Sequence, residues 1–495
     1  MSKIIIQNGN MCELDLPLKF AQKLYNEFAI RHPNAFYLRT RQRGMQNWDG
    51  KIHYITKTGQ FKIGLLPKVY DMCIEMGIKP KVVDMRQPLP KVSKVVTKIG
   101  KYKLRPEQEK AVKAVINNTI GGKPFHIGVL DYTVNAGKTL IMSSLYLSYK
   151  KQLKTLLITN DSDWLNQARE EFKQYLPGED ITFVQGKVLN WSNFTIGMVQ
   201  SISRNMRFYQ KELSQIDMVL IDEADQGGSK QYQNVITRLF NTRIRIGLSG
   251  TIYMSKLAKD RVKNMNLECF FGKVIAEFKL KDSIKKGYST KTVVKMVPGK
   301  PWYGNWESDC ISYKEIYDDS ITNCYTAWLM AYNRLLWNLN QGRYPALVVC
   351  KHIAHCENLY KFFKKKLGDA YNIAYVHVNT PSKLRQQIMK DFREGKIDIL
   401  VSTTIIARGK NFPKLRYLLN AASMDSQEKS IQFLGRLVRT DKSKKKVYLD
   451  DLHYPGPYLD RHGKHRKQYY QRQELKVILL DKLWKKHPNH SLIKS

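Results

Sequence analysis

The sequence has few acidic residues, with 43 aspartates and glutamates against 83 lysines and arginines and a formal net charge of +40. An excess of this size favours a polyanionic partner. Nucleic acid is favoured over a membrane surface, because no segment has the pattern of an amphipathic anchor. General solubility is the alternative explanation. Residues 1–98 and 441–495 are each basic by themselves, so the positive charge is not confined to one segment.

Long apolar runs are also missing. None approaches the ~18–20 residues needed to cross a bilayer, and the first residues lack the layout of a secretory signal. The seven cysteines include no C-x-x-C pair, which suits free thiols in a reducing compartment. We therefore expect a cytoplasmic protein without membrane association, in the host cytoplasm if the chain is phage-encoded.

One group of metal-ligating residue types stands close together in the sequence, Cys350, His352, His355 and Cys356. The apolar run before it predicts a strand, and the residues after it predict a helix. The four side chains would then point to different sides of a strand–helix junction. We do not expect a zinc site there.

Short apolar β-rich runs alternate with amphipathic segments from about residue 105 to 255, and again after about residue 345. Strand–helix alternation is typical of parallel α/β sheets. The sequence therefore predicts two α/β domains in tandem between basic ends. The expected parts are an N-terminal α+β accessory domain (1–98), a first α/β domain (99–285), a second (286–452) and a basic helical tail (453–495).

The stretch VNAGKT (134–139) follows a predicted strand and precedes a predicted helix, which is the context of a phosphate-binding loop. Its pattern departs from G-x-x-x-x-G-K-[ST], because Tyr132 occupies the place of the first glycine. In such a loop Lys138 would neutralise the γ-phosphate, and the Thr139 hydroxyl would bind Mg²⁺.

The stretch IDEAD (221–225) ends an apolar run with carboxylates. At the edge of a sheet, Asp222 would support Mg²⁺ and Glu223 would polarise the attacking water. The spacing of ~80 residues from Lys138 suits two strands of one nucleotide-binding sheet. The two motifs together predict an ATPase.

The stretch QFLGRLVR (432–439) places Arg436 and Arg439 three residues apart, on one face of a predicted helix. Both guanidinium groups would then be able to reach one phosphate. We expect them to act as arginine fingers across a cleft between the two α/β domains.

With these motifs the chain resembles the superfamily 2 helicases. RPEQ (105–108) is similar to their adenine-recognising motif, and TNDSDWLNQ, GMVQS, SGT and VSTTIIARGKNFP follow in the family's order across residues 105–440. The resemblance implies two RecA-like domains with ATP and Mg²⁺ as cofactors. It implies ATP contacts from Arg105, Gln108, Asn135, Ala136, Gly137, Lys138, Thr139, Gly409 and Gln432. It implies nucleic-acid contacts from Gln200, Ser201, Thr403 and Arg408.

The departures from the family pattern limit what is carried over. The first loop glycine is often absent in this superfamily, which agrees with Tyr132. Thr404 replaces a frequent aspartate, so that residue's role is not assigned here. The PTREL sequence of RNA-acting members is missing, so the DEAD string does not by itself indicate an RNA helicase.

Residues 39–66 are similar to the accessory domain of phage UvsW-type helicases. That likeness implies action on forks, junctions and R-loops, with branched or single-stranded DNA, or an RNA:DNA hybrid, as partner and a monomeric enzyme. We expect Arg41, Arg43 and Trp48 to contact nucleic acid, with Trp48 stacking on an unpaired base. Packing of Trp48 in a small core is the alternative.

Three other functions remain open at the sequence level. The chain has the motifs of a double-stranded DNA translocase, although it shows no nuclease or methylase module. An RNA helicase is a second enzyme alternative. A strand-annealing nucleic-acid binder with an inactive ATPase is the non-enzymatic one, and the presence of Lys138, Glu223, Arg436 and Arg439 argues against it.

Overall fold

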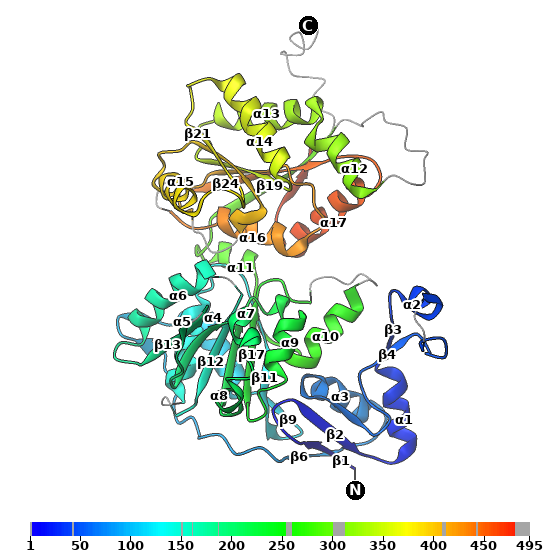
Figure 1. The fold of residues 1–495 in the computed structure, drawn as a ribbon. Helices are drawn as coiled ribbons and strands as arrows, with labels where there is room; N and C mark the ends of the chain where they lie inside the picture. The colour runs from blue at the N-terminus through cyan, green and yellow to red at the C-terminus, as the bar shows by residue number, and fades with distance from the viewer. Residues whose placement is uncertain are drawn as a thin grey trace. The chain divides into compact units, whose positions relative to one another are not determined.

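The computed structural model describes residues 2–41, 44–149, 152–160, 162–186, 188–253, 260–299, 312–407, 412–441 and 444–480. The chain divides into two compact units, 1–278 and 279–495. Each unit is built around its own large, mainly parallel sheet (Figure 1). The division lies ahead of the predicted boundary after residue 285, because α11 (Leu280–Lys285) falls in the second unit.

The sheet of the first unit has the strand order β14-β13-β15-β12-β16-β17-β11-β18. Its strands run parallel except for the β13–β14 pair. Every residue of the four neighbouring strands β12, β16, β17 and β11 is buried, as expected for a parallel sheet covered on both faces. The strands are β11 (His126–Tyr132), β12 (Thr155–Thr159), β13 (Ile181–Gln185), β14 (Val188–Leu189), β15 (Phe194–Met198), β16 (Met218–Asp222), β17 (Ile244–Ser249) and β18 (Val274–Phe278).

Helices cover both faces of this sheet (Figure 1). One layer contains α4, α5 and α6, which contact one another in turn, and the other contains α7, α9 and α10. The helices are α4 (Pro106–Ile116), α5 (Lys138–Ser148), α6 (Ser162–Tyr175), α7 (Val199–Arg204), α8 (Gln210–Ser214), α9 (Lys230–Ile236) and α10 (Arg261–Phe271). Two short strand pairs lie beside them, β7 (Lys98–Ile99) with β8 (Tyr102–Lys103), and β9 (Thr119–Ile120) with β10 (Lys123–Pro124).

The N-terminal residues form a small α+β region with the strand order β5-β2-β1-β6. Its main elements are β1 (Lys3–Ile6), β2 (Met11–Asp15), α1 (Leu18–Glu27), β5 (Gln60–Lys62), α3 (Leu66–Glu75) and β6 (Lys81–Asp84). One hydrophobic core joins this region to the α/β sheet, from Ile4 and Phe61 to Ile127 and Phe271. A Cβ on Gly64 would lie 2.0 Å from the Glu268 carbonyl oxygen, so the two backbones are in close contact. The N-terminal region is therefore packed onto the first α/β domain.

Arg245 on β17 ties the same two parts together. The side chain is fully buried, and its Nη2 donates to the Gly9 carbonyl at 2.6 Å and to Asn10 Oδ1 at 2.7 Å. Its Nη1 donates to the Phe270 carbonyl at 3.2 Å. Burial lowers the pKa of this guanidinium, because the charged form loses its hydration. The hydrogen bonds to three acceptors compensate for that loss.

We expect Arg245→Met to destabilise the first unit by about 3–5 kcal/mol, because the buried acceptors would lose a charged donor. Chemical denaturation of the full chain measures this change. The exposed Arg238→Met is the matched control and should leave the transition unchanged. Equal midpoints for Arg245→Met and wild type would show that the buried guanidinium does not hold these parts together.

The second unit contains a seven-stranded sheet, parallel throughout, with the order β21-β22-β20-β23-β24-β19-β25. Its strands are β19 (Lys291–Pro298), β20 (Ala346–Cys350), β21 (Ile373–Val376), β22 (Ile399–Thr403), β23 (Tyr417–Asn420), β24 (Lys446–His453) and β25 (Val477–Leu479). Its other helices are α12 (Tyr313–Tyr317), α13 (Tyr325–Leu339), α14 (Ile353–Leu367), α15 (Ser382–Glu394), α16 (Gln427–Leu437) and α17 (Leu459–Arg472). The predicted fold, two tandem RecA-like α/β domains with an N-terminal α+β region, is confirmed.

The segment predicted as a basic tail is largely built into this second unit. Strand β25 pairs with β19 and forms the edge of the sheet, and α17 contacts α16 and β24. Arg466 on α17 is fully buried, and its Nε donates to Asp451 at 2.9 Å. It also donates to the Met424 and Leu452 carbonyls, each at 2.9 Å. Residues 481–495 lie outside the described part.

Among the described residues, no helix has both the length and the apolarity that a membrane span requires.

Candidate functional site

The predicted phosphate loop lies between a buried strand and a helix, as expected. Strand β11 ends at Tyr132 and α5 begins at Lys138. Asn135 (φ 64°) and Gly137 (φ 72°) both have left-handed backbone conformations, which asparagine and glycine tolerate best. The turn brings the first N–H groups of α5 to the C-terminal edge of the sheet, where they have no partner within the helix.

Tyr132 shows why the first loop glycine is dispensable. The residue is the last of β11 and fully buried, so it belongs to the sheet. Its hydroxyl donates to the Glu107 carbonyl at 2.8 Å, which directs the ring toward α4 and away from the loop. The left-handed turn needed by the loop is supplied three and five residues later by Asn135 and Gly137.

The residues expected to contact adenine lie against the same loop. Gln108 Nε2 donates to the Ala136 carbonyl at 2.8 Å, and Arg105 Nη1 donates to the Asn135 carbonyl at 3.2 Å. A Cβ on Gly137 would lie 2.3 Å from Gln108 Nε2, so this contact requires glycine. Both residues therefore brace the loop, while contact of Gln108 with adenine stays a prediction.

The acidic motif lies at the same sheet edge as the loop. Strands β16, β17 and β11 are neighbours in the sheet, and Asp222 pairs with Leu248 while Ser249 pairs with Asp131. Parallel strands spaced about 4.8 Å apart thus place Asp222 roughly 10 Å from Leu130, near the end of β11 from which the loop starts. The ends of three strands converge on one site, as the ~80-residue spacing predicted.

Two local features shape the acidic motif. Glu223 has a left-handed backbone (φ 52°), a conformation that is uncommon for residues other than glycine and that is found at functional sites. Ser249 Oγ donates to Asp225 Oδ1 at 2.7 Å and accepts from the Thr251 N–H at 3.1 Å. The SGT stretch is thereby tied to the last acid of IDEAD.

Tyr232 on α9 is a site neighbour that sequence reasoning missed. Its side chain is buried, and its pKa is raised well above 10, first by burial and then by the carboxylates of Glu223, Asp222 and Asp225. The neutral hydroxyl is thus a potential hydrogen-bond donor close to the acidic group. No sequence signal could have identified it, because it belongs to none of the motifs.

The residues at this edge fit a nucleoside triphosphate with Mg²⁺. Left-handed conformations at Asn135 and Gly137 turn successive N–H groups toward one concavity, which is an anion-binding arrangement. Lys138 adds a positive charge at the start of α5. The Thr139 hydroxyl and the Asp222 carboxylate are the oxygen ligands that Mg²⁺ prefers.

Residues expected to contact nucleic acid lie farther along the same edge. Gln200 and Ser201 are on α7, directly after β15, which neighbours β12. Gln200 Nε2 donates to the Asn160 carbonyl at 3.4 Å, and Ser201 Oγ accepts from the Gly186 N–H at 2.9 Å. The phosphate loop and the residues expected to contact nucleic acid therefore lie at the same edge of the sheet. Those contacts themselves stay predictions.

In the second unit, Thr403 is buried at the end of β22, and Gln432 and Arg436 lie on α16. Two contacts hold the end of α16. Thr290 Oγ1 donates to the Arg439 carbonyl at 3.1 Å, and the buried Lys444 Nζ donates to the Leu437 carbonyl at 3.1 Å. Because α16 ends at Leu437, Arg439 lies beyond the helix, and the prediction that the two arginines share one helix face is wrong. The backbone at Arg439 is held by its contact with Thr290.

Three predicted site residues lie outside the described part: Arg43, Arg408 and Gly409. Arg41 and Trp48 are described, and both lie in a small lobe of the N-terminal region, β3 (Ala29–Arg31), α2 (Ala35–Arg41) and β4 (Lys51–His53). No group of three or more potential metal-ligating side chains was found among the described residues.

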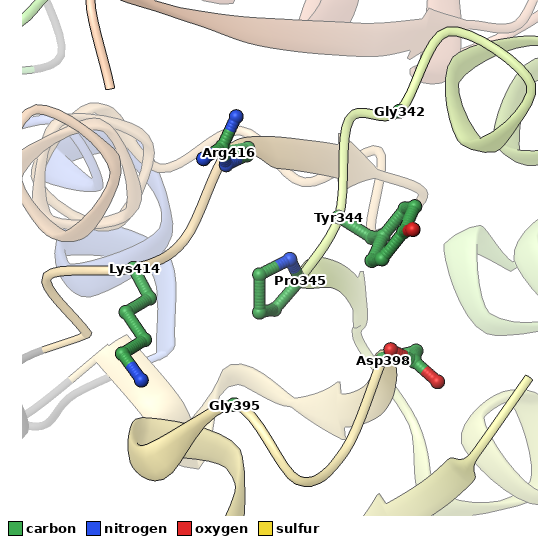
Figure 2. A pocket seen from close by; sticks show the side chains of 7 residues that line it. All are labelled: Gly342, Tyr344, Pro345, Gly395, Asp398, Lys414 and Arg416. Atoms are coloured by element: carbon green, nitrogen blue, oxygen red, sulfur yellow. The ribbon is translucent and has the colours of Figure 1, made fainter. Parts of the chain in front are cut away.

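A pocket in the second unit lies away from the predicted site (Figure 2). Pro345, Asp398 and Arg416 line it, and each directly precedes one of the parallel strands β20, β22 and β23. The pocket is therefore at the N-terminal edge of the sheet, opposite the edge where Thr403 ends β22. Lys414 on its wall donates to the Glu394 carbonyl at 2.7 Å. Its location separates it from the predicted nucleotide and nucleic-acid residues.

Two family models match the chain in the same order as the two units. The model for the type III restriction enzyme res subunit matches residues 101–254, and that for the helicase conserved C-terminal domain matches residues 329–441. These spans include the phosphate loop and the acidic motif in the first, and Thr403 and both arginines in the second.

Three relatives are about a fifth identical to the chain over the aligned residues. A putative helicase of Sulfolobus islandicus filamentous virus is 22% identical over 71% of this chain and 64% of its own length. The putative ATP-dependent helicase IRC3 of Saccharomyces cerevisiae is 23% identical over 70% of this chain and 51% of its own length. The chain thus spans less than two thirds of these two relatives. The ATP-dependent DNA helicase uvsW of Enterobacteria phage T4 is 22% identical over 82% of each chain.

Solved structures agree with the fold. A fragment of a putative HsdR subunit of a type I restriction enzyme from Vibrio vulnificus matches 87% of this chain and 78% of its own, with a TM-score of 0.58 and 15% identity. Saccharomyces cerevisiae Dbp5 bound to RNA and ADP BeF3 matches 77% of this chain and 91% of its own, with a TM-score of 0.52 and 14% identity. At such identities the likeness concerns the fold alone.

Proposed function

We propose that this chain, a member of the superfamily 2 helicases, is an ATP-dependent helicase that remodels or unwinds branched DNA. The observation that carries the ATPase part is the convergence of the phosphate loop, the acidic motif and the SGT stretch on one edge of three neighbouring strands. The cofactors are ATP and Mg²⁺, as in the rest of the superfamily.

In this proposal the residues of the first unit bind ATP with Mg²⁺ and activate the attacking water. Lys138 and the N–H groups at the start of α5 hold the phosphates, and Thr139 and Asp222 hold Mg²⁺, whose charge offsets that developing on the transferred phosphoryl group. Glu223 orients the attacking water and accepts its proton. The left-handed backbone of Glu223 supports this role, because such conformations concentrate at functional sites.

In the proposal the second unit supplies two arginines to the ATP site and one of the nucleic-acid contacts. Arg436 and Arg439 stabilise the transition-state charge when the two domains close around ATP. Gln200, Ser201 and Thr403 contact the phosphate backbone, which would give binding that ignores sequence and weakens with salt. Alternate closing and opening would then move the protein along a strand in the host cytoplasm.

Branched DNA is the favoured substrate for two reasons. The relative aligned over 82% of both chains is named as an ATP-dependent DNA helicase. The net charge of +40 suits several nucleic-acid arms around one junction.

Unwinding assays with matched labels test the substrate directly. We expect forks, Holliday junctions and R-loops to be unwound at least about tenfold faster than an RNA duplex of equal length, with ATP hydrolysis stimulated by DNA. Linear blunt duplex DNA and ATP-free reactions are the controls. Faster unwinding of the RNA duplex would contradict the DNA assignment. Absence of stimulation by any nucleic acid would refute the helicase function.

A double-stranded DNA translocase is the second candidate, because the model matched by residues 101–254 describes a restriction-enzyme subunit. Such a motor would displace a third strand from a triplex in an ATP-dependent manner without separating the duplex. Triplex displacement together with no unwinding of forks would favour this alternative.

A further inference from the structure

The N-terminal region carries a projecting lobe, residues 29–53, which we name the α2 lobe. Strands β3 and β4 form its antiparallel stem, with Ile30 opposite Ile52, and α2 stands at its tip (Figure 1). The stem is attached by packing, since the ring of His53 on β4 stacks on Tyr25 of α1 at 4.1 Å. Ala35 is buried at the start of α2, so the helix has a defined orientation on the stem.

Two consecutive aromatic rings on α2 face solvent. The side chain of Phe36 is 79% exposed and that of Tyr37 is 54% exposed, among the largest exposures of apolar residues in the described chain. Arg41, one turn later, lies over the Tyr37 ring at 4.8 Å, so one face of that ring is already covered. Phe36 therefore presents the most accessible aromatic surface of the lobe.

Trp48, the residue expected from the sequence to stack on a base, contacts other residues of the α2 lobe. Its Nε1 donates to the Lys51 carbonyl at 2.9 Å, and its ring meets His32 edge-on at 5.7 Å. These contacts fix the loop that leads into β4. Trp48 is well placed to support the lobe, while Phe36 is better placed to contact a ligand.

The charge of the lobe indicates the class of ligand. The exposed cations in its described residues are Arg31, Arg39, Arg41 and Lys51. Asp49 is the one acidic residue between positions 29 and 53, and its carboxylate lies 2.6 Å from His53. An exposed aromatic ring among cations is the arrangement that binds single-stranded nucleic acid, with the ring under a base and the cations on phosphates.

We propose that Phe36 stacks on an unpaired base at the branch point of a DNA fork or junction, with Arg39 contacting a flanking phosphate. This inference rests on the proposed function, because it assigns the recognition of branched DNA to one side chain. Arg39 follows Phe36 by three positions and therefore lies on the same side of α2. The lobe would thus distinguish a branch, which offers unpaired bases, from a linear duplex, which offers none.

The test compares Phe36→Ala with Phe36→Trp in the full-length chain. We expect Phe36→Ala to bind a fork with unpaired branch-point nucleotides about tenfold more weakly than wild type, and linear duplex equally well. Phe36→Trp should retain fork affinity, since it keeps a flat ring. Leu18→Ala is the control for loss of an exposed apolar side chain, because Leu18 is 88% exposed and not aromatic.

A 2-aminopurine base at the branch point gives a second readout. Its fluorescence should be quenched by wild type and Phe36→Trp and not by Phe36→Ala, as stacking requires. Unchanged fork affinity and quenching in Phe36→Ala would overturn the inference, and equal losses on fork and linear duplex would do so as well. The proposed function is assessed separately by the stimulation of wild-type ATP hydrolysis by forks. Stimulated wild type with an unaffected Phe36→Ala variant refutes only the role of Phe36.

Discussion

Arg439→Ala should lower the turnover of DNA-stimulated ATP hydrolysis by about 10³–10⁵-fold, the range found where an arginine finger is removed from other nucleotide hydrolases. A guanidinium group that reaches the transferred phosphoryl stabilises charge that develops only in the transition state. DNA affinity should change by less than about threefold, because the proposed role lies in the ATP site. The backbone of Arg439 is held in place, since its carbonyl accepts from Thr290 Oγ1 at 3.1 Å.

Steady-state kinetics with saturating DNA, together with separate binding measurements, check this expectation. Arg393→Ala is the matched control, because Arg393 is an exposed arginine of the second unit on α15. Parallel losses of turnover and DNA affinity in Arg439→Ala would place the residue in the nucleic-acid contact instead. An unaltered turnover would exclude the finger role.

Lys138→Ala should lower ATP turnover by at least about 10²–10³-fold, since it removes a preorganised charge from the phosphates. The side chain begins α5 at the left-handed turn through Gly137, so its position is set by the backbone. The fold should be unaffected, because the Lys138 side chain is only half-buried.

The measurement is ATP hydrolysis with and without fork DNA, and Lys110→Ala, an exposed lysine on α4, is the control. DNA binding without ATP should persist in Lys138→Ala, which separates a lost motor from a lost binder. Wild-type rates in this variant would mean that the loop at 134–139 does not hold the phosphates, and would favour the annealing alternative with an inactive ATPase.

Much of the candidate site follows from the sequence because its chemistry is local. Asp222 is the last residue of β16, and Lys138 follows β11 after the short loop 133–137; parallel strands bring their C-terminal ends to one edge. The order of the motifs then identifies which strands carry them. Contacts between the motifs and other parts of the fold could not be predicted from the sequence. The contact of Ser249 with Asp225, the turn of Tyr132 toward Glu107 and the proximity of Tyr232 to the acids depend on packing.

The extent of the domains shows the same limit. Residues 1–98 have the composition of a separate basic domain, yet Arg245 reaches Gly9 across 236 positions of sequence, and one core joins both parts. The C-terminal segment reads as a charged tail, yet Arg466 is buried against Asp451 and β25 closes the sheet. Charge counts cannot show this, because a basic side chain is as frequent in a helix that packs as in one that does not.

The sequence by itself determined the fold class, the ATP-binding motifs and the family, since these depend on residue periodicity and on short spacings that do not need distant partners. The tertiary structure decided where the N-terminal region and the C-terminal helix belong, and which aromatic ring of the α2 lobe is free to bind. Trp48 and Phe36 are equally apolar in sequence, and only packing makes one a support and leaves the other 79% exposed. The physical reason is that burial and hydrogen bonding are set by contacts between distant segments, which local sequence does not specify.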